Sequence, residues 1–461
     1  MPDSWDLIVI GGGAAGLGAA RAGAATGART LLVVEGEIGG ECTFTGCVPS
    51  KALIEAAARG TAFPAAMAAV RHAVAAIAAT ETPDVLAAEG VEVLRGPAVF
   101  TSQREVSVAG QVLRARAFIV ATGSQPSVPP VPGLAGTGYL TNETIFDLTE
   151  LPARLAVLGG GPVGCELAQA FARLGSQVTL IEAAPRLLPA ADPEASQVIG
   201  EVFAAEAISV RTGAAAASVK QDDKTVTVTL PSGEEISADR LLVVTGRQPV
   251  ASHLGLETAG VRLDERGHIV TDRHLATTAA GIYAAGDVTG RMPFTHAAFA
   301  MGYLAARNAL RHRWSQSRTF KTAAIPWVVF TDPEVAQVGL TEAQAATAHA
   351  GARVAWLPMT EADRAVTAGH TEGFIKIIAG PRRVLGNAGG GRILGATIVA
   401  ARAGEMIHEP VLAMRTGMFT GRLAQATHAY PTWSLAIQQT AAQFFGRHGG
   451  RTARAARPSP G

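Results

Sequence analysis

The order of apolar and polar positions near the start of the chain predicts a strand, a glycine turn, a helix and a second strand. The apolar run Asp6–Ile10 (DLIVI) leads into Gly11–Gly16 (GGGAAG), and an Ala-rich stretch follows to about Gly27. The next apolar run is Thr30–Glu35 (TLLVVE). Short continuous apolar runs bounded by glycine are typical of strands that are buried on both faces of a parallel sheet.

A second copy of this pattern lies further along the chain. Leu155–Leu158 (LAVL) is followed by Gly159–Gly164 (GGGPVG), a helical stretch and the apolar run Gln177–Glu182. Each copy later reaches a β-rich region that ends in a similar phrase, VATGSQP at Val120–Pro126 and VVTGRQP at Val243–Pro249. The repetition predicts two dinucleotide-binding domains of common ancestry.

The pattern changes in the last third of the chain, after an apolar strand expected within Thr278–Asp287. Beyond Lys321 we expect strands at Ile325–Thr331, Gly373–Ile378 and Ile393–Ala400, and helices at Thr341–His349 and Gly404–Thr416. With an enlarged hairpin turn at Gly386–Arg392, this part is predicted to be an α+β domain with antiparallel strands. The basic tail from Arg447 has no apolar periodicity, so we expect it to be disordered.

Composition and charge exclude several classes of protein. Of 461 residues, 48% are hydrophobic and 17% charged, and the net charge of +1 gives no reason to expect nucleic acid or an anionic membrane as a partner. Three cysteines are too few for a disulfide-stapled secreted protein. The N-terminus lacks a basic n-region, so we expect no signal peptide and a cytoplasmic location. The apolar stretch Thr61–Thr80 is interrupted by Pro64, Arg71 and His72, which predicts an Ala-rich core helix and no membrane span.

The two glycine motifs have the spacing of nucleotide-binding turns. Their glycines are Gly11, Gly13 and Gly16 in the first copy and Gly159, Gly161 and Gly164 in the second. Each motif follows a strand and precedes a helix, so its backbone can approach a pyrophosphate at the helix N-terminus. Glu35 lies 19 residues after Gly16 and Glu182 lies 18 after Gly164, and each is expected to accept a hydrogen bond from a ribose hydroxyl. Two glycine turns without a ligand are the less favoured interpretation.

Glu182 also bears on the choice of nicotinamide cofactor. A carboxylate at this position suits the free 2′-hydroxyl of NADH and repels the 2′-phosphate of NADPH. Arg186 lies nearby and weakens the argument, although we favour its interpretation as a solvated surface charge. NADH is therefore expected, with NADPH the less favoured cofactor.

A cysteine pair, Cys42 and Cys47, lies in GGECTFTGCVPSK (Gly39–Lys51). Five residues of regular helix rise about 7.5 Å, whereas a disulfide needs Cα atoms within about 7 Å. Cys42 is therefore expected to precede the regular helix, with Gly46 at the bend and Pro49 in the first turn. Cys47 then lies near a helix N-terminus, whose dipole favours the thiolate.

Other interpretations of the cysteines are less favoured. Zinc binding by the pair is disfavoured because no second Cys or His pair has ligand spacing, and two buried structural thiols would not need these flanking residues. Cys165, inside the second dinucleotide helix, is predicted to be a small core residue.

Together these motifs resemble the pyridine nucleotide–disulfide oxidoreductases, the family of dihydrolipoamide dehydrogenase, glutathione reductase and mercuric reductase. The likeness covers residues 5 to about 446. It implies an α/β homodimer with two Rossmann-like dinucleotide-binding domains, for FAD and NAD, and a C-terminal α+β dimerisation domain. The implied boundaries are 1–148 and 273–322 for the two parts of the FAD-binding domain, 149–272 for the NAD(P)H-binding domain, 323–446 for the dimerisation domain and 447–461 for the tail.

The resemblance also implies cofactor contacts. The first glycine motif and Glu35 would bind FAD, and Asp287 would hydrogen-bond the ribityl chain of the flavin. Gly123 and Gly246, in the two repeated phrases, would lie in the cofactor-binding regions.

The resemblance implies roles at the reacting atoms as well. Cys47 would be the sulfur that faces the flavin, and Cys42 the sulfur that exchanges with substrate. Lys51 matches a lysine near flavin N5, and Glu166 matches the glutamate that pairs with it close to the nicotinamide.

The C-terminal motif departs from the pattern of the family's reductases. These enzymes commonly end with His-Pro-Thr and a glutamate three residues beyond the threonine, and the partner subunit supplies that histidine as the acid/base. This chain reads HAYPTWSL, so Tyr430 stands in place of the histidine and Leu435 in place of the glutamate. His428 matches an additional histidine of dihydrolipoamide dehydrogenases, and both His428 and Tyr430 stay candidates for the acid/base.

Some features are similar to mercuric reductases and others differ from them. The tyrosine at position 430 and the segments Glu166–Gly175 and Ile325–Ala336 are similar to those enzymes, but the tail of this chain has no second cysteine pair. Pro162 also replaces a tyrosine that often gates the nicotinamide pocket.

We therefore expect a FAD enzyme that takes hydride from NADH and passes electrons to a Cys42–Cys47 disulfide. A small disulfide or related acceptor is our first choice, and mercuric-reductase-like metal or quinone reduction is the second. A flavin-bound redox sensor with little turnover is the alternative from another class. We expect no metal site in the protein itself.

Overall fold

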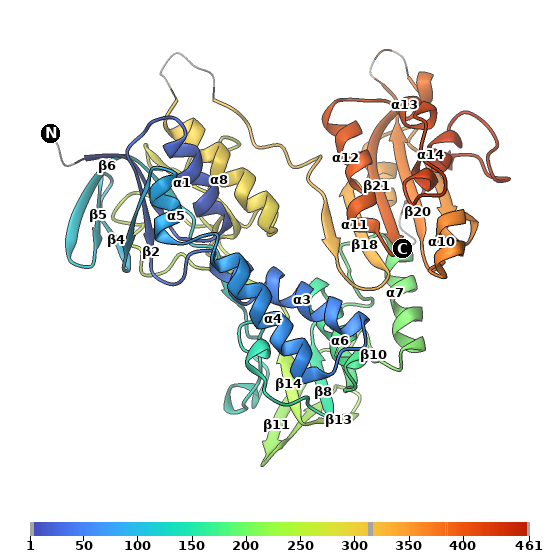
Figure 1. Cartoon of the computed structure of the whole chain (residues 1–461), viewed down its shortest axis with the longest axis horizontal. Helices are drawn as coiled ribbons and strands as arrows, with labels where there is room; N and C mark the ends of the chain where they lie inside the picture. Colours follow the sequence, from blue (N-terminus) through green and yellow to red (C-terminus); the bar gives the residue numbers. More distant parts are fainter. Residues whose placement is uncertain (1–3, 312–316, 383, 385, 459–461) are drawn as a thin grey trace. The chain divides into compact units, whose positions relative to one another are not determined.

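A computed structural model describes residues 4–311, 317–382, 384 and 386–458 (Figure 1). Contacts divide the chain into two compact units: unit 1 is Met1–Pro129, Leu140–Glu150 and Val243–Lys321, and unit 2 is Pro130–Tyr139, Leu151–Leu242 and Thr322–Gly461. Residues 243–272, which we expected in the NAD(P)H-binding domain, cluster with unit 1. The finer division into domains stays a prediction.

Unit 1 is built on a mainly parallel sheet. Its strand order is β3-β2-β1-β6-β5-β4, and β16 pairs with β6 in parallel. The strands are β1 (Ser4–Ile10), β2 (Thr30–Val34), β3 (Val91–Arg95), β4 (Ala98–Ser102), β5 (Glu105–Val108), β6 (Gln111–Val120) and β16 (Ile282–Ala284). Since β1 pairs in parallel with β2 and β6, the carboxyl ends of these buried strands meet at one edge of the sheet, and the turn after β1 lies there.

Helices α1 (Ala14–Ala24) and α8 (Thr295–Ala309) lie side by side in unit 1 (Figure 1). Glycine allows this close approach, because a Cβ on Gly302 would lie 1.8 Å from the Ala15 carbonyl oxygen. A Cβ on Gly18 would lie 2.6 Å from that of Phe299. The middle of α8 thereby packs against the first turns of α1, which the first glycine motif opens.

The apolar stretch near residue 70 is not the core helix that we expected. Phe63–Ala88 is long and apolar enough for a membrane span by length and composition, but it consists of α4 (Phe63–Ala78) and α5 (Pro83–Ala88). The 16 residues of α4 rise about 24 Å, less than a hydrocarbon core of about 30 Å. Most of α4 is exposed. An Ala-rich stretch need not be a core helix, because alanine favours helix formation whether or not it is buried.

The two repeated phrases pair with each other in unit 1. Strand β7 (Ser124–Pro126) of the first phrase runs antiparallel to β15 (Arg247–Pro249) of the second, with Arg247 opposite Pro126. The sequence repeat predicted their similarity, whereas their mutual pairing is a finding of the structure.

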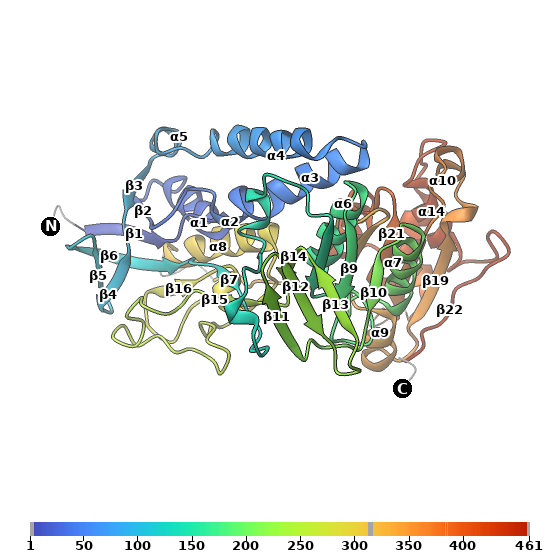
Figure 2. The same ribbon diagram turned by 90° about the horizontal axis from the view of Figure 1, so that it is seen from below.

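Unit 2 contains the second copy of the strand–helix–strand pattern, within Leu151–Leu242. Its sheet has the order β10-β9-β8-β14. A separate antiparallel sheet has the order β11-β12-β13, and its strands are labelled in Figure 2. The elements are β8 (Arg154–Leu158), α6 (Pro162–Arg173), β9 (Gln177–Ile181), α7 (Pro193–Ala205), β10 (Ser209–Arg211), β11 (Ser218–Asp222), β12 (Thr225–Thr229), β13 (Glu235–Ala238) and β14 (Arg240–Val243). Cys165 is fully buried in α6, as predicted.

The C-terminal part of unit 2 is an antiparallel sheet covered by helices. The strand order is β17-β18-β21-β20-β19-β22, and β20 and β21 form the predicted hairpin. The strands are β17 (Trp327–Val329), β18 (Glu334–Gly339), β19 (Arg353–Pro358), β20 (Phe374–Gly380), β21 (Arg392–Ala400) and β22 (Arg454–Ala455). The helices are α9 (Glu342–Ala348), α10 (Asp363–Ala368), α11 (Ala403–Met406), α12 (His408–Arg415), α13 (Thr420–Gln425) and α14 (Leu435–Ala442). The single helix predicted at Gly404–Thr416 is thus two helices.

The expectation of a disordered tail is wrong for its described residues. β22 pairs antiparallel with β19, and the Ala456 amide donates to the Ala352 carbonyl at 2.9 Å. Arg451 also forms an ion pair with Glu361 at 2.7 Å. The backbone groups of an edge strand and scattered ion pairs order this segment, and neither leaves an apolar periodicity in the sequence. Residues 459–461 lie outside the described part.

Candidate active site

The two cysteines lie on either side of a sharp bend. Cys42 is in the short helix α2 (Gly40–Phe44), and Cys47 is the first residue of α3 (Cys47–Ala58). A Cβ on Gly46 would lie 2.9 Å from the Glu41 carbonyl oxygen, so the bend requires glycine. The predicted bend at Gly46 and the place of Pro49 in the first turn of α3 are confirmed, although the short helix around Cys42 was not expected.

Thr295, the first residue of α8, contacts both sulfurs. Its hydroxyl donates to Cys42 Sγ at 3.1 Å and lies 3.3 Å from Cys47 Sγ. Because Cys47 and Thr295 each open a helix, two helix N-termini converge on the sulfur pair. Both dipoles favour negative charge there.

The two sulfurs differ in how readily they lose a proton. A hydrogen bond with Cys47, followed by burial, raises the pKa of the Cys42 thiol well above its usual range. Cys42 is the more buried of the two, since Cys47 is exposed. The geometry therefore suits a reduced state in which the Cys42 thiol keeps its proton and donates to the sulfur of Cys47.

A polar network holds the residue that precedes Cys42. Arg247 of β15 forms a bidentate ion pair with Glu41, and Asn142 donates to Glu41 Oε1 at 2.5 Å. Arg247 Nε also donates to Ser124 Oγ at 2.8 Å, and Ser124 Oγ donates to Asp287 Oδ2 at 2.7 Å. The network thus joins α2, the antiparallel pair of strands β7 and β15, and the predicted flavin-binding carboxylate of Asp287.

We expect Arg247→Met to loosen α2. The variant leaves the partly buried carboxylate of Glu41 without its guanidinium partner. Removing one partner of a buried polar group costs about 1–3 kcal/mol of folding stability. Alkylation of Cys42 by iodoacetamide should become several-fold faster, read by mass spectrometry. Arg104→Met, on the exposed β4–β5 turn, is the matched control. An unchanged alkylation rate in Arg247→Met would show that the network does not restrain the helix.

The first glycine motif forms a cradle that side chains would close. A Cβ on Gly11 would lie 2.3 Å from the Ala121 carbonyl oxygen, and one on Gly16 would lie 1.8 Å from that of Gly11. At Gly13, before the first residue of α1, a Cβ would meet no described atom within 4 Å. The motif is thus tight on its inner side and open at the helix N-terminus, where a pyrophosphate would fit. The carboxylate of Glu35, just after β2, is exposed.

Two further glycines predicted for cofactor binding directly precede strands β7 and β15. Gly123 has φ +75°, and a Cβ there would also meet no described atom within 4 Å. The carbonyl oxygen of Gly246 accepts the amide of Ser127 at 3.0 Å, which ties the second phrase to the first.

The second motif repeats this geometry and adds a fixed carboxylate. A Cβ on Gly161, which precedes α6, would meet no described atom within 4 Å, and Gly159 has φ +115°. Glu182 accepts the amide of Gly160 at 2.5 Å and that of Ala184 at 2.6 Å. Each carboxylate oxygen keeps a lone pair for a further donor.

Arg186 is not the solvated surface charge that we expected. Its guanidinium donates to the carbonyl oxygens of Ala191 at 2.9 Å and Pro189 at 2.7 Å, and to Ser196 Oγ at 3.3 Å. The side chain therefore stabilises the loop to which it belongs.

The other predicted residues of the redox centre lie in different units. Lys51 is on α3, one turn after Cys47, and its Nζ donates to Ser50 Oγ at 3.3 Å. Glu166, on α6 of unit 2, is buried, and its Oε1 accepts the Phe330 amide at 2.9 Å. Their pairing stays a prediction.

The acid/base candidates have contrasting surroundings. Tyr430 is 71% exposed, and a hydrogen bond with Asp363 raises its pKa. The side chain of His428 is 10% exposed, with Nδ1 3.0 Å from the Ala426 carbonyl oxygen and Nε2 3.1 Å from Glu409 Oε2. Leu435, the first residue of α14, brings no polar group.

Comparisons with known proteins agree with this geometry. A family model described as pyridine nucleotide-disulphide oxidoreductase matches residues 5–302, and the dimerisation domain of the same family matches residues 325–441. The dihydrolipoyl dehydrogenase of Thermus scotoductus is 37% identical over 95% of this chain and 97% of its own length. The mercuric reductase of Streptomyces lividans is 37% identical over 95% and 96%. The solved HOCl-induced flavoprotein disulfide reductase RclA from Escherichia coli has a TM-score of 0.87 and 30% identity over 95% of this chain and 99% of its own.

Proposed function

Because the chain belongs to the pyridine nucleotide-disulphide oxidoreductase family, we propose that it passes electrons from NADH, through FAD, to Cys42–Cys47 and then to a small disulfide. It is an NAD(P)H-dependent, FAD-dependent flavoprotein disulfide oxidoreductase. Its dimerisation domain supports a homodimer. The proposal concerns the residues at each step, the preference for NADH and the final acceptor.

The first glycine motif and its surroundings fit FAD. The open position at Gly13 and the exposed carboxylate of Glu35 suit a pyrophosphate and a ribose, and Asp287 lies in the turn η3 (Asp287–Thr289), on the network that reaches Glu41. Bound there, FAD would supply the transfer of an electron pair from the nicotinamide to the disulfide.

The convergence of Cys42, Cys47 and Thr295 is the observation that carries the proposal. Adding two electrons and one proton to the disulfide gives one thiolate and one thiol. The helix N-termini favour the thiolate at Cys47, and the raised pKa of Cys42 keeps the proton there. Cys42 would then attack the acceptor once its proton is removed.

We expect NADH to be used with kcat/KM at least about tenfold above that for NADPH, a difference of about 1.4 kcal/mol. The two amides hold the Glu182 carboxylate, which would repel the 2′-phosphate of NADPH, and Arg186 is bound within its own loop. Steady-state kinetics with both cofactors measure the ratio, which Glu182→Gln should narrow and Arg186→Met should leave within about twofold. Equal use of both cofactors by wild type would contradict the role of Glu182.

The acceptor is tested with a panel of compounds. Purified holoenzyme is assayed with NADH and glutathione disulfide, lipoamide, an aromatic disulfide, quinones, Hg²⁺ and Cu²⁺, for wild type and Cys42→Ser. Disulfide turnover that Cys42→Ser removes supports the proposal. Slow turnover with every acceptor favours the flavin-bound sensor instead.

Metal-ion reduction is the second candidate. It is favoured by the similarity to the mercuric reductase of Streptomyces lividans and by a solved Cu(II) complex of RclA. Among the described residues no group of three or more His, Cys, Asp and Glu could hold a metal, so the ion would be a substrate of the two thiols. Metal-dependent NADH oxidation that exceeds disulfide turnover would favour this candidate.

A further inference from the structure

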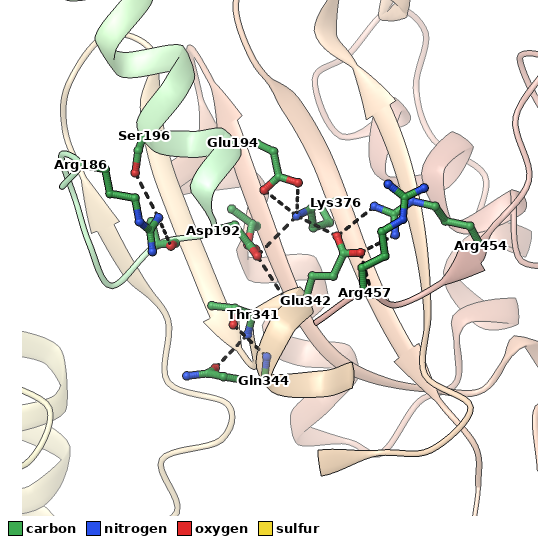
Figure 3. A network of polar contacts seen from close by, with 12 residues as sticks. Arg186, Asp192, Glu194, Ser196, Thr341, Glu342, Gln344, Lys376, Arg454 and Arg457 are labelled. Carbon is green, nitrogen blue, oxygen red and sulfur yellow. Dashed lines mark hydrogen bonds and ion pairs between the residues drawn. The ribbon is translucent and has the colours of Figure 1, made fainter. Parts of the chain in front are cut away.

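Figure 3 shows a cluster of charged side chains in unit 2, whereas Cys42 and Cys47 belong to unit 1. Lys376 of β20 has a side chain 1% exposed, and its Nζ lies 2.9 Å from both oxygens of Glu194. Nζ is also 3.1 Å from Glu342 Oε2 and 3.4 Å from Asp192 Oδ1. Burial alone would lower the pKa of Lys376, but the carboxylates outweigh it and the pKa is raised, so the lysine stays charged.

The C-terminal tail supplies a second cation to this cluster. Arg454 of β22 forms a bidentate ion pair with Glu342, and the amide of Arg457 donates to the same carboxylate at 3.0 Å. One lysine faces three carboxylates, of which Asp192 and Glu342 are buried and Glu194 is partly exposed, so negative charge is in excess. Arg454 offsets part of this charge through its ion pair with Glu342. Removing one partner of a buried ion pair strongly destabilises the fold.

The other end of the cluster fixes a loop. Asp192 has a side chain 1% exposed, and its Oδ2 accepts from Thr397 Oγ1 at 2.5 Å while its Oδ1 accepts the Glu342 amide at 3.1 Å. Asp192 precedes the first residue of α7 and ends the loop 183–192, which follows Glu182. Its position therefore determines where the loop ends.

The same loop contacts the second glycine motif. The amide of Leu188 donates to the Gly160 carbonyl oxygen at 2.9 Å, and the Gly160 amide donates to Glu182. Within the loop, Arg186 donates to the carbonyl oxygen of Ala191, next to Asp192. Contacts thus run without interruption from the tail to the turn proposed to hold the nicotinamide cofactor.

We propose that the C-terminal tail is a positioning element for the pyridine-nucleotide pocket, acting from Arg454 through Glu342, Lys376 and Asp192 on the loop 183–192. None of these four residues needs to touch the cofactor. They set the affinity for the nucleotide and leave the chemistry at the cysteines unchanged. The inference rests on the proposed function, in which the second glycine motif binds NADH.

The test compares Arg454→Met with a matched tail variant, Arg451→Met. Arg451 pairs with Glu361, outside the cluster. Binding of NAD⁺ to the holoenzyme is measured by calorimetry, NADH kinetics by steady-state assay, and exchange of the amides of residues 183–192 by deuterium labelling. Mutations along such a network change coupling by about 2–30-fold. We expect Arg454→Met to weaken NAD⁺ binding and raise the KM for NADH by about 3–10-fold, with kcat within twofold and faster exchange at Leu188.

Further variants separate positioning from general stability. Arg454→Lys should keep part of the NAD⁺ affinity that Arg454→Met loses, and Arg451→Met should keep the affinity of wild type. If Arg454→Met does not fold, Thr397→Val, which removes one hydrogen bond to Asp192, should give the same weakening and faster exchange. Wild-type affinity and exchange in the folded variant would overturn this inference alone, as would equal weakening by Arg451→Met. Failure of wild type to bind NAD⁺ would overturn the proposed function with it.

Discussion

Cys47→Ser is expected to abolish the long-wavelength absorbance that wild type develops when NADH reduces it anaerobically, while the bound FAD and its yellow colour remain. Such a band requires a thiolate next to oxidised flavin. Cys47 opens α3, and the N-terminus of α8 also converges on it, so it is the sulfur best placed to hold a negative charge. Absorbance spectra recorded during NADH titration measure the effect.

Cys42→Ser is the matched control for this prediction. It removes the second sulfur and leaves Cys47 without a disulfide partner, so the band should be present even before NADH is added. Acceptor turnover should be lost in both variants. A band that persists in Cys47→Ser, or that Cys42→Ser removes in its place, would reverse the assignment of the two cysteines.

The second large effect concerns proton transfer. We expect dihydrolipoamide oxidation and glutathione disulfide reduction to be slow, with flavin reduction by NADH still fast, because a positioned acid/base contributes about 10²–10⁴-fold. The raised pKa of Cys42 makes a proton acceptor necessary. Tyr430 cannot serve at neutral pH, since its hydrogen bond with Asp363 raises a pKa that is already high. Stopped-flow and steady-state rates separate the two half-reactions.

His428 is a poor replacement for the missing base. Burial alone would lower its pKa, but the hydrogen bond and charge of Glu409 raise it, so His428 stays protonated to a pH above its usual 6.5. Both ring nitrogens are also engaged within the chain. The pair with Glu409 stabilises the fold fully below pH 6.5 and loses this effect as pH rises through the raised pKa.

Three variants examine the acid/base prediction. The double variant Tyr430→His, Leu435→Glu should raise disulfide exchange at least about tenfold, and Tyr430→Phe should leave it unchanged. Dihydrolipoamide turnover by wild type at about 10² s⁻¹ or more would contradict the prediction. Loss of turnover in His428→Ala alone would show that the base lies two residues earlier than in the family's reductases.

The parts of the fold that follow local rules could be predicted from the sequence. The strands before Gly11 and Gly159 and the helices after them lie where the apolar runs and glycines placed them. The bend at Gly46 followed from helix geometry and disulfide reach. In these places neighbouring residues alone determine the backbone.

The parts that depend on distant residues could not be predicted. Thr295 lies 248 residues from Cys47, and Arg247 lies 206 residues from Glu41, so no local pattern links them. The adjacency of Glu41 to Cys42 and the arginine in the second repeated phrase were the available signals. The tail and α4 were misjudged for a related reason, because main-chain pairing with an edge strand and the exposure of alanines both depend on what the rest of the chain places beside them.

The antiparallel pairing of β7 with β15 has a consequence for recombining this enzyme with its relatives. The two strands come from the two repeated phrases, yet each completes the other's backbone hydrogen bonds, and Arg247 reaches Ser124 across the pair. A chimera whose crossover falls between residues 126 and 247 joins strands with different parents. Crossovers placed before Val120 or after Val250 keep the pair from one parent and should give a higher fraction of folded, flavin-loaded progeny.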